Sequence, residues 1–98
     1  MSKSPIQLNS YLLEDFIDIY KKLPQEIRDK VRKTYRIWKD NNFHPSIKFK
    51  LVLPKEHVWS VRIIGNNGYR ALGIVKDNDC FWFWIGTHDD YMRELGKK

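Results

Sequence analysis

The feature that most constrains the fold is a set of three strand-like segments near the C-terminus, joined by very short links. The segments are Val58–Ile64, Tyr69–Val75 and Cys80–Ile85. Gly65–Gly68 joins the first pair, and Asp77–Asp79 joins the second. Glycine, asparagine and aspartate tolerate the positive φ that tight hairpin turns require. The sequence therefore predicts three consecutive antiparallel strands in this part of the chain.

Two helical segments precede these strands. Apolar residues recur at helical spacing up to Leu23, and Asn9 or Ser10 can cap the start of the helix. Pro24 ends this helix and suits the first position of a second helix, Pro24–Asp40. Because the link between the two helices is so short, they are predicted to form an antiparallel helical hairpin.

Two further strands and a last helix complete the expected topology. Ile6–Asn9 is expected as a short first strand, and Ile47–Leu53 alternates apolar and polar residues as strands do. A short helix is expected to end near Leu95. This order predicts one α+β domain over residues 1–98. Its N-terminal helical hairpin packs on a twisted antiparallel sheet of four or five strands, and a short C-terminal helix follows.

Alternation along the strands predicts which side chains face the helices. Trp59, Val61 and Ile63 point to one side of their strand, and we expect the helices to cover that side. The alternation leaves the side of Arg70 open, because a bulge near the preceding turn would reverse it. Cys80–Ile85 is apolar on both sides, which is typical of a central strand covered on both faces. The basic residues expected on the uncovered side are Arg62, Lys48 and Lys50.

Net charge restricts the classes of partner. The formal net charge is +6, which favours an anionic partner, either nucleic acid or an acidic protein segment. Residues 1–43 and 44–98 each carry 9 basic and 6 acidic residues, so the charge belongs to the folded domain and not to a tail. The second helix carries a basic stripe that is either a solvated face or a phosphate-binding surface. Its arginines are Arg28, Arg32 and Arg36.

Several classes of protein are disfavoured by the sequence. The single cysteine, Cys80, cannot form an internal disulfide, and no signal peptide or membrane-length apolar run is visible. A cytoplasmic protein without membrane contact is therefore expected. The three histidines lack the spacing of a ligand pair, and no phosphate-binding glycine loop is present, so we expect no metal and no cofactor.

Four stretches of this sequence resemble the RelE/ParE superfamily of type II toxin–antitoxin toxins, and the helical hairpin around Leu23-Pro24 is similar as well. The resemblance covers roughly residues 6–95. It implies a small twisted sheet with a helical hairpin, and an acidic antitoxin that neutralises the toxin. The four stretches are Phe43–Lys50, Trp59–Arg62, Tyr69–Gly73 and Trp84–Tyr91.

The resemblance also implies a set of functional residues. RelE-like members cleave mRNA on the ribosome without a metal, using basic residues of the sheet and a histidine or tyrosine near the C-terminus. In ParE-like members the target is DNA gyrase and no RNA is cut. A third alternative is an inactive module that only binds the antitoxin. By position, the residues that match the RelE-like set are Arg62, Arg70, Lys48 and Lys50, with His88 or Tyr91 as the C-terminal group.

Those residue types suit RNA cleavage on chemical grounds. When a 2′-hydroxyl attacks the adjacent phosphate, negative charge grows on the phosphate oxygens, and a fixed arginine or lysine stabilises it. One group must accept the 2′-hydroxyl proton, and another must protonate the leaving 5′-oxygen. An imidazole can serve in either role near neutral pH.

Overall fold

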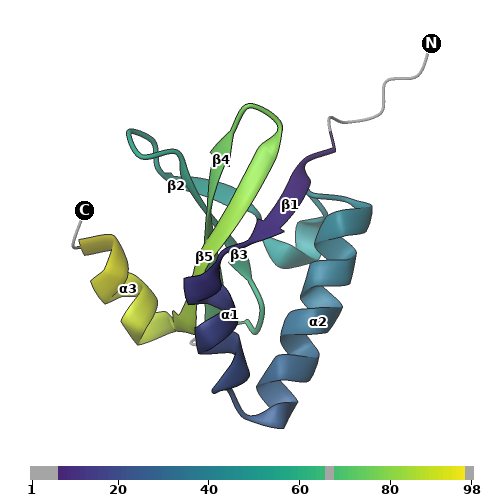
Figure 1. Ribbon diagram of the computed structural model, residues 1–98, viewed down its shortest axis with the longest axis vertical. Coiled ribbons are helices and arrows are strands. Elements are labelled where there is room, and N and C mark those ends of the chain that lie inside the picture. Colours follow the sequence, from purple (N-terminus) through teal and green to yellow (C-terminus); the bar gives the residue numbers. More distant parts are fainter. Residues whose placement is uncertain (1–6, 66–67, 97–98) are drawn as a thin grey trace.

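The computed structural model describes residues 7–65 and 68–96 (Figure 1). No helix in these residues is long and apolar enough to cross a membrane. The elements, in chain order, are β1 (Asn9–Leu12), α1 (Glu14–Lys21), α2 (Gln25–Asp40), a 3₁₀ turn η1 (Pro45–Ile47), β2 (Lys50–Leu53), β3 (Val58–Arg62), β4 (Tyr69–Lys76), β5 (Asp79–Thr87) and α3 (His88–Gly96).

The described strands form one five-stranded sheet in the order β1-β5-β4-β3-β2. The pairs from β2 to β5 are antiparallel, so the predicted run of consecutive antiparallel strands is confirmed. β1 instead pairs with β5 in parallel. The sheet is therefore mixed, and the prediction of a wholly antiparallel sheet was wrong in its edge strand.

The start of the chain differs from the prediction. The first strand is Asn9–Leu12, three residues later than expected, and residue 6 lies outside the described residues. Asn9 and Ser10 therefore belong to a strand and do not cap a helix. α1 starts at Glu14, after Leu13, which makes no side-chain cap hydrogen bond. Pairing with β5, about 70 residues away, holds this segment extended, and no local sequence pattern shows that pairing.

Two other boundaries also moved. α2 begins at Gln25, and Pro24 is its N-cap instead of its first helical residue. The strand predicted from Ile47 begins only at Lys50, because Lys48 has a left-handed backbone with φ of 49° that ends η1. In the turn predicted at Asp77–Asp79, Asp77 has a positive φ of 57°, as expected. The two asparagines of the other turn lie outside the described residues.

The two faces of the sheet are covered unequally. On one side, here called the hairpin face, α1 and α2 bury a continuous core around Trp38, Phe49 and Trp82. On the other side, here called the α3 face, a smaller cluster forms around Leu72 and Tyr91. In Figure 1, α1 lies between α2 and α3.

The predicted helix-facing residues of β3, and Ile63 just after it, lie on the hairpin face. Val61 belongs to its core, and Trp59 and Ile63 pack against that core. In β5, Phe83 is the extra residue of a bulge, since Leu72 lies opposite Trp84 and the next residue, Gly73, lies opposite Trp82. Trp82 and Trp84 therefore contribute to different clusters, and β5 is covered on both faces, as predicted.

Candidate active site

Two arginines face each other on neighbouring strands. Arg62 of β3 lies directly opposite Arg70 of β4. Arg70 is two residues from Leu72 on β4, so both side chains lie on the α3 face. Arg62, opposite Arg70, lies on that face too. The structure thus shows on which side of the sheet Arg70 lies, which the sequence pattern did not determine. Arg70 Nη1 donates to the carbonyl of Ile64 at 2.8 Å, and Arg62 Nη2 approaches the carbonyl of Ser46 at 3.5 Å. Like charges placed directly opposite each other repel, so this arrangement favours an anion between them.

The start of α3 brings a histidine and a tyrosine to the same region. Thr87 Oγ1 accepts a hydrogen bond from the Asp90 N–H at 3.3 Å, which caps the helix. Residues three apart share a helix side, and the ring centroids of His88 and Tyr91 are 5.8 Å apart. His88 is half-buried, whereas Tyr91 is only 7% exposed and packs beside Leu72.

The electrostatics of Arg70 show that the two arginines and Tyr91 interact. Burial, and then the charge of Arg62, lower the pKa of the Arg70 guanidinium, and the nearby Tyr91 raises it. An arginine nevertheless remains protonated at neutral pH. The site therefore holds two fixed positive charges close together. Such a pair can hold a phosphate through several charge-assisted hydrogen bonds.

Sequence reasoning missed one polar group of this site. Tyr91 Oη donates to Ser60 Oγ at 3.4 Å, and Ser60 is only 2% exposed. Ser60 precedes Arg62 by two residues on β3, so both side chains lie on the α3 face. The sequence signal that could have revealed Ser60 is its position two residues before Arg62, which places both side chains on the same face of a strand. Lys50 lies opposite Ser60 in the β2–β3 register, which places this predicted residue on the same face.

Comparisons with known proteins identify the architecture. No protein-family model matches the chain, and no curated protein matches it significantly. Solved structures do match it. The RelB–RelE antitoxin–toxin complex from Methanococcus jannaschii has a TM-score of 0.66 and 14% identity, over 86% of this chain and 96% of that chain. An arginine-to-alanine double mutant of the E. coli toxin RelE, in the free state, has a TM-score of 0.66 and 15% identity, over 93% and 92%.

A third match is the RelE–RelB complex from Pyrococcus horikoshii. Its TM-score is 0.64 at 9% identity, over 84% of this chain and 96% of that chain. This chain has the RelE-like toxin fold. The fold resemblance seen in the sequence is therefore confirmed.

Within the RelE-like fold, the arginines of α2 do not join the pair on the sheet. Arg32 lines an apolar pocket on the hairpin face together with Val61 and Trp82. Residues four apart share a helix side, so Arg28 and Arg36 flank Arg32. The sheet therefore separates the α2 arginines from Arg62 and Arg70.

Lys48 is placed less simply than predicted. It is exposed, but its left-handed backbone breaks the alternation that grouped it with Lys50. It follows η1, whose Ser46 carbonyl is approached by Arg62. His44 caps this turn, because its Nδ1 accepts from the Ser46 N–H at 3.1 Å. In the part of the chain that the structure describes, no three His, Cys, Asp or Glu side chains could hold a metal ion together.

Proposed function

We propose that this protein is the toxin of a type II toxin–antitoxin pair and that it cleaves mRNA on the ribosome. One observation carries the proposal: Arg62 and Arg70 are paired across two strands, on the face where His88 and Tyr91 also lie. A site with two fixed cations, and an imidazole that contacts the tyrosine beside one of them, suits a phosphodiester substrate.

The chemistry assigns a role to each group. The RNA 2′-oxygen attacks the adjacent phosphorus and loses its proton, and the bond from phosphorus to the 5′-oxygen breaks. The products are a 2′,3′-cyclic phosphate and a 5′-hydroxyl that has gained a proton. Arg62 and Arg70 stabilise the charge that grows on the phosphate oxygens. Half-buried His88 carries one of the two proton transfers, either from the 2′-hydroxyl or to the 5′-oxygen, and water carries the other. Buried Tyr91 positions Arg70 and His88.

The proposed partner is an acidic antitoxin. Two of the matched structures are complexes of RelE with RelB, the first of which is described as an antitoxin–toxin complex. The net charge of +6 on this chain favours an acidic partner segment, which would screen the arginines. A cytoplasmic location follows from this function, since both mRNA and ribosomes are there.

The test is cleavage of mRNA bound to purified ribosomes, read by mapping the new 5′ ends. We expect cuts within the codon in the ribosomal A site. Arg62→Ala should slow cleavage on the order of 10²–10³-fold, because it removes one contact to the developing charge. His88→Ala should slow cleavage roughly 10²–10⁴-fold, because it removes a proton-transfer group.

The matched control is Lys33→Ala on α2, which removes an exposed positive charge from a residue that does not line the site. Its cleavage rate should equal that of the unaltered protein. If Arg62→Ala and His88→Ala both fold and still cleave at the parent rate, the site is wrong. An SOS response in expressing cells with intact mRNA would instead favour DNA gyrase as the target.

A further inference from the structure

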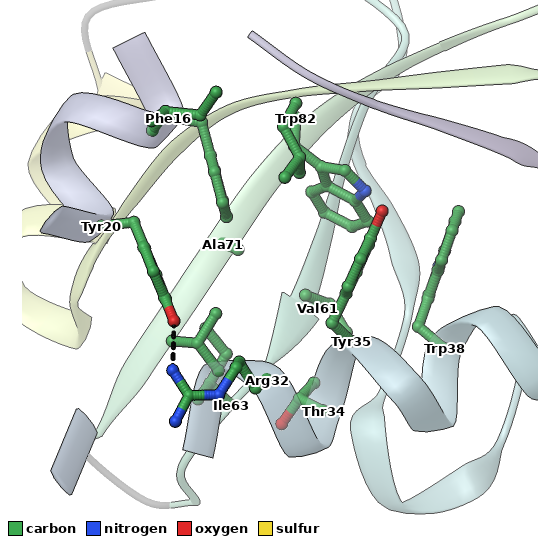
Figure 2. A pocket seen from close by; sticks show the side chains of 13 residues that line it. Phe16, Tyr20, Arg32, Thr34, Tyr35, Trp38, Val61, Ile63, Ala71 and Trp82 are labelled. Carbon is green, nitrogen blue, oxygen red and sulfur yellow. Dashed lines mark hydrogen bonds between the residues drawn. The ribbon is translucent and has the colours of Figure 1, made fainter. Parts of the chain in front are cut away.

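An apolar pocket lies on the hairpin face, on the far side of the sheet from the arginine pair. It has a volume of about 200 Å³ and lies between α1, α2 and the strands (Figure 2). Phe16 and Ile17 line it from α1, Tyr35 and Trp38 from α2, and Trp82 from β5. Among the described lining residues, Arg32 is the only charged one.

The pocket is large enough for an apolar side chain. A cavity of about 150 Å³ lined by aliphatic and aromatic groups is known to bind benzene, so a pocket of this size and lining accepts an aromatic ring or a leucine side chain. Apolar side chains are also exposed at one edge of it. Leu12, which lines the pocket, is 42% exposed, and the next residue, Leu13, is 40% exposed. Exposed apolar groups gathered at a pocket favour binding of an apolar partner.

Positive charge borders the pocket. Arg32 donates from Nη1 to Tyr20 Oη at 2.7 Å, which links α2 to α1 at the pocket (Figure 2). The Arg32 guanidinium also pairs with Asp29 on the same helix, and the Arg32 side chain is about half exposed, so it remains in contact with solvent. Lys39 Nζ lies 5.5 Å from the centroid of the Tyr35 ring, which itself lines the pocket. Arg28 lies one helical turn before Arg32 on the same side of α2. The apolar pocket is therefore bordered by a basic stripe.

We propose that this pocket anchors an acidic segment of the antitoxin by taking up one of its apolar side chains, while its carboxylates meet Arg28, Arg32 and Lys39. This inference rests on the proposed function and adds a binding site to it. It also gives the basic stripe of α2 a protein partner instead of RNA. RNA suits the site less, because a phosphodiester chain would meet the stripe but would leave the apolar interior unfilled.

The location of the pocket implies that the hairpin face binds the antitoxin segment, whereas the α3 face carries the arginine pair. Val61 lines the pocket, while its neighbours Ser60 and Arg62 point to the α3 face. An antitoxin segment in the pocket therefore does not itself cover the arginine pair. It holds the antitoxin on the toxin, and another part of the antitoxin must reach the active site. Changes at the pocket should weaken antitoxin binding without changing cleavage by the free toxin.

The experiment uses the full chain and the purified acidic protein encoded beside it, with affinity measured by titration calorimetry. Ile17→Asp places a carboxylate in the pocket, and Arg32→Glu reverses the charge beside it. Because buried anchor side chains dominate interface affinity, each should weaken binding by about 5- to 30-fold or more. The control Lys33→Glu makes the same charge change on the same helix, at an exposed residue that does not line the pocket. It should change affinity by much less.

Indole N–H resonances in NMR spectra of the unaltered protein provide a second measurement. The side chains of Trp38 and Trp82 line the pocket, and their indole N–H groups are buried without a hydrogen-bond partner within the described residues. Both resonances should shift when the antitoxin binds. Because this measurement needs no substitution, it tests the proposal even if the Ile17→Asp variant does not fold. A single-stranded RNA oligonucleotide should leave both in place.

Failure of this inference differs from failure of the proposed function. If the antitoxin binds without shifting the Trp38 and Trp82 resonances, or binds Arg32→Glu and folded Ile17→Asp as tightly as the parent, the pocket is not its anchor. A shift caused by RNA instead of the antitoxin, or an antitoxin that fails to bind the unaltered chain, also overturns the inference. The cleavage assay decides separately on the proposed function, because none of these variants touches the arginine pair.

Discussion

The two faces of the sheet differ in what their residues do. The hairpin face buries aromatic rings against each other, with Trp38 placed edge-on to both Phe49 and Trp82 at centroid distances of 5.7 and 5.3 Å. The α3 face has a smaller apolar cluster, and beside it lie Arg62 and Arg70, which repel each other. Stability is therefore concentrated on one face and the candidate chemistry on the other.

This separation explains how such short strands can contribute both to the stable core and to the candidate active site. Adjacent residues of a strand point to opposite faces, so Val61 fills the core while Arg62, the next residue, stays available to a ligand. A substitution on β3 or β4 should therefore affect either stability or activity, according to the face it occupies. Each prediction below tests that difference.

The largest effect is expected where the bulge in β5 sends neighbouring aromatic residues to different clusters. Trp82 is 3% exposed and contacts the rings of Trp38 and Phe49 on the hairpin face. Trp82→Ala should reduce the free energy of unfolding by about 3–5 kcal/mol, because it empties the centre of the core. Denaturant unfolding measures this directly, and antitoxin binding should be lost with the fold.

The control for this substitution is Phe83→Ala, next in the chain. Phe83 is half-buried, packs against the smaller cluster and is the extra residue of the bulge. Its loss should destabilise the protein clearly less than the loss of Trp82. Equal losses at the two positions would show that the α3 face is as important for stability as the hairpin face.

Sequence patterns alone were sufficient for the parts of the fold that are local. The side of Trp59, Val61 and Ile63 followed from alternation, and both helices of the hairpin followed from periodicity and Pro24. A short first strand was expected at Ile6–Asn9, but the bounds of β1, Asn9–Leu12, and its parallel pairing did not follow, because β1 pairs with a strand about 70 residues away.

The candidate site was predictable in type but not in arrangement. The resemblance to RelE-like toxins pointed to Arg62, Arg70 and His88 as candidates, and the structure brings Arg62 and Arg70 together through the β3–β4 register. Alternation could not determine which side of β4 carries Arg70, because a bulge near the preceding turn would have reversed it; the β3–β4 pair has a continuous register, and the bulge at Phe83 lies in the β4–β5 pair. The pocket was not predicted at all, because its lining comes from α1, α2 and the four strands β1, β3, β4 and β5.

A smaller effect is expected from adding one methyl group to the sheet. A Cβ on Gly73 would lie 2.8 Å from Cys80 Sγ and 2.9 Å from Trp82 Cε3, on the crowded hairpin face. Gly73→Ala should therefore cost about 1–3 kcal/mol of stability through overpacking. Gly65→Ala is the matched control, since a Cβ there meets no atom within 4 Å and should be nearly neutral. A Gly73→Ala protein as stable as the parent would mean that β4 and β5 can move apart on this face.

Alkaline pH should weaken the hairpin face through its one thiol. Burial raises the pKa of Cys80 from 9.0 to about 12. Because the unfolded thiol ionises first, its contribution is complete below pH 9 and is lost as the pH rises from 9 toward 12. At pH 10 the loss should be about 1.4 kcal/mol. Cys80→Ala, which has no thiol, should lack this part of the pH dependence even if it is less stable at pH 7. Parallel stability curves for the two proteins between pH 8 and 10 would contradict the prediction.

The smallest change in stability is expected on the α3 face. Tyr91→Phe removes only the hydroxyl, whose hydrogen bond to Ser60 Oγ is long at 3.4 Å, so the cost should be about 1 kcal/mol or less. The ring, which is 7% exposed, keeps its packing.

If Tyr91 only positions Arg70 and His88, cleavage should slow by a few-fold, and Ser60→Ala should produce a similar decrease because it removes the same hydrogen bond. If Tyr91 itself transfers a proton, Tyr91→Phe should slow cleavage roughly 10²–10⁴-fold while Ser60→Ala does not. Comparing kcat for the two variants therefore decides whether Tyr91 supports the site or reacts in it.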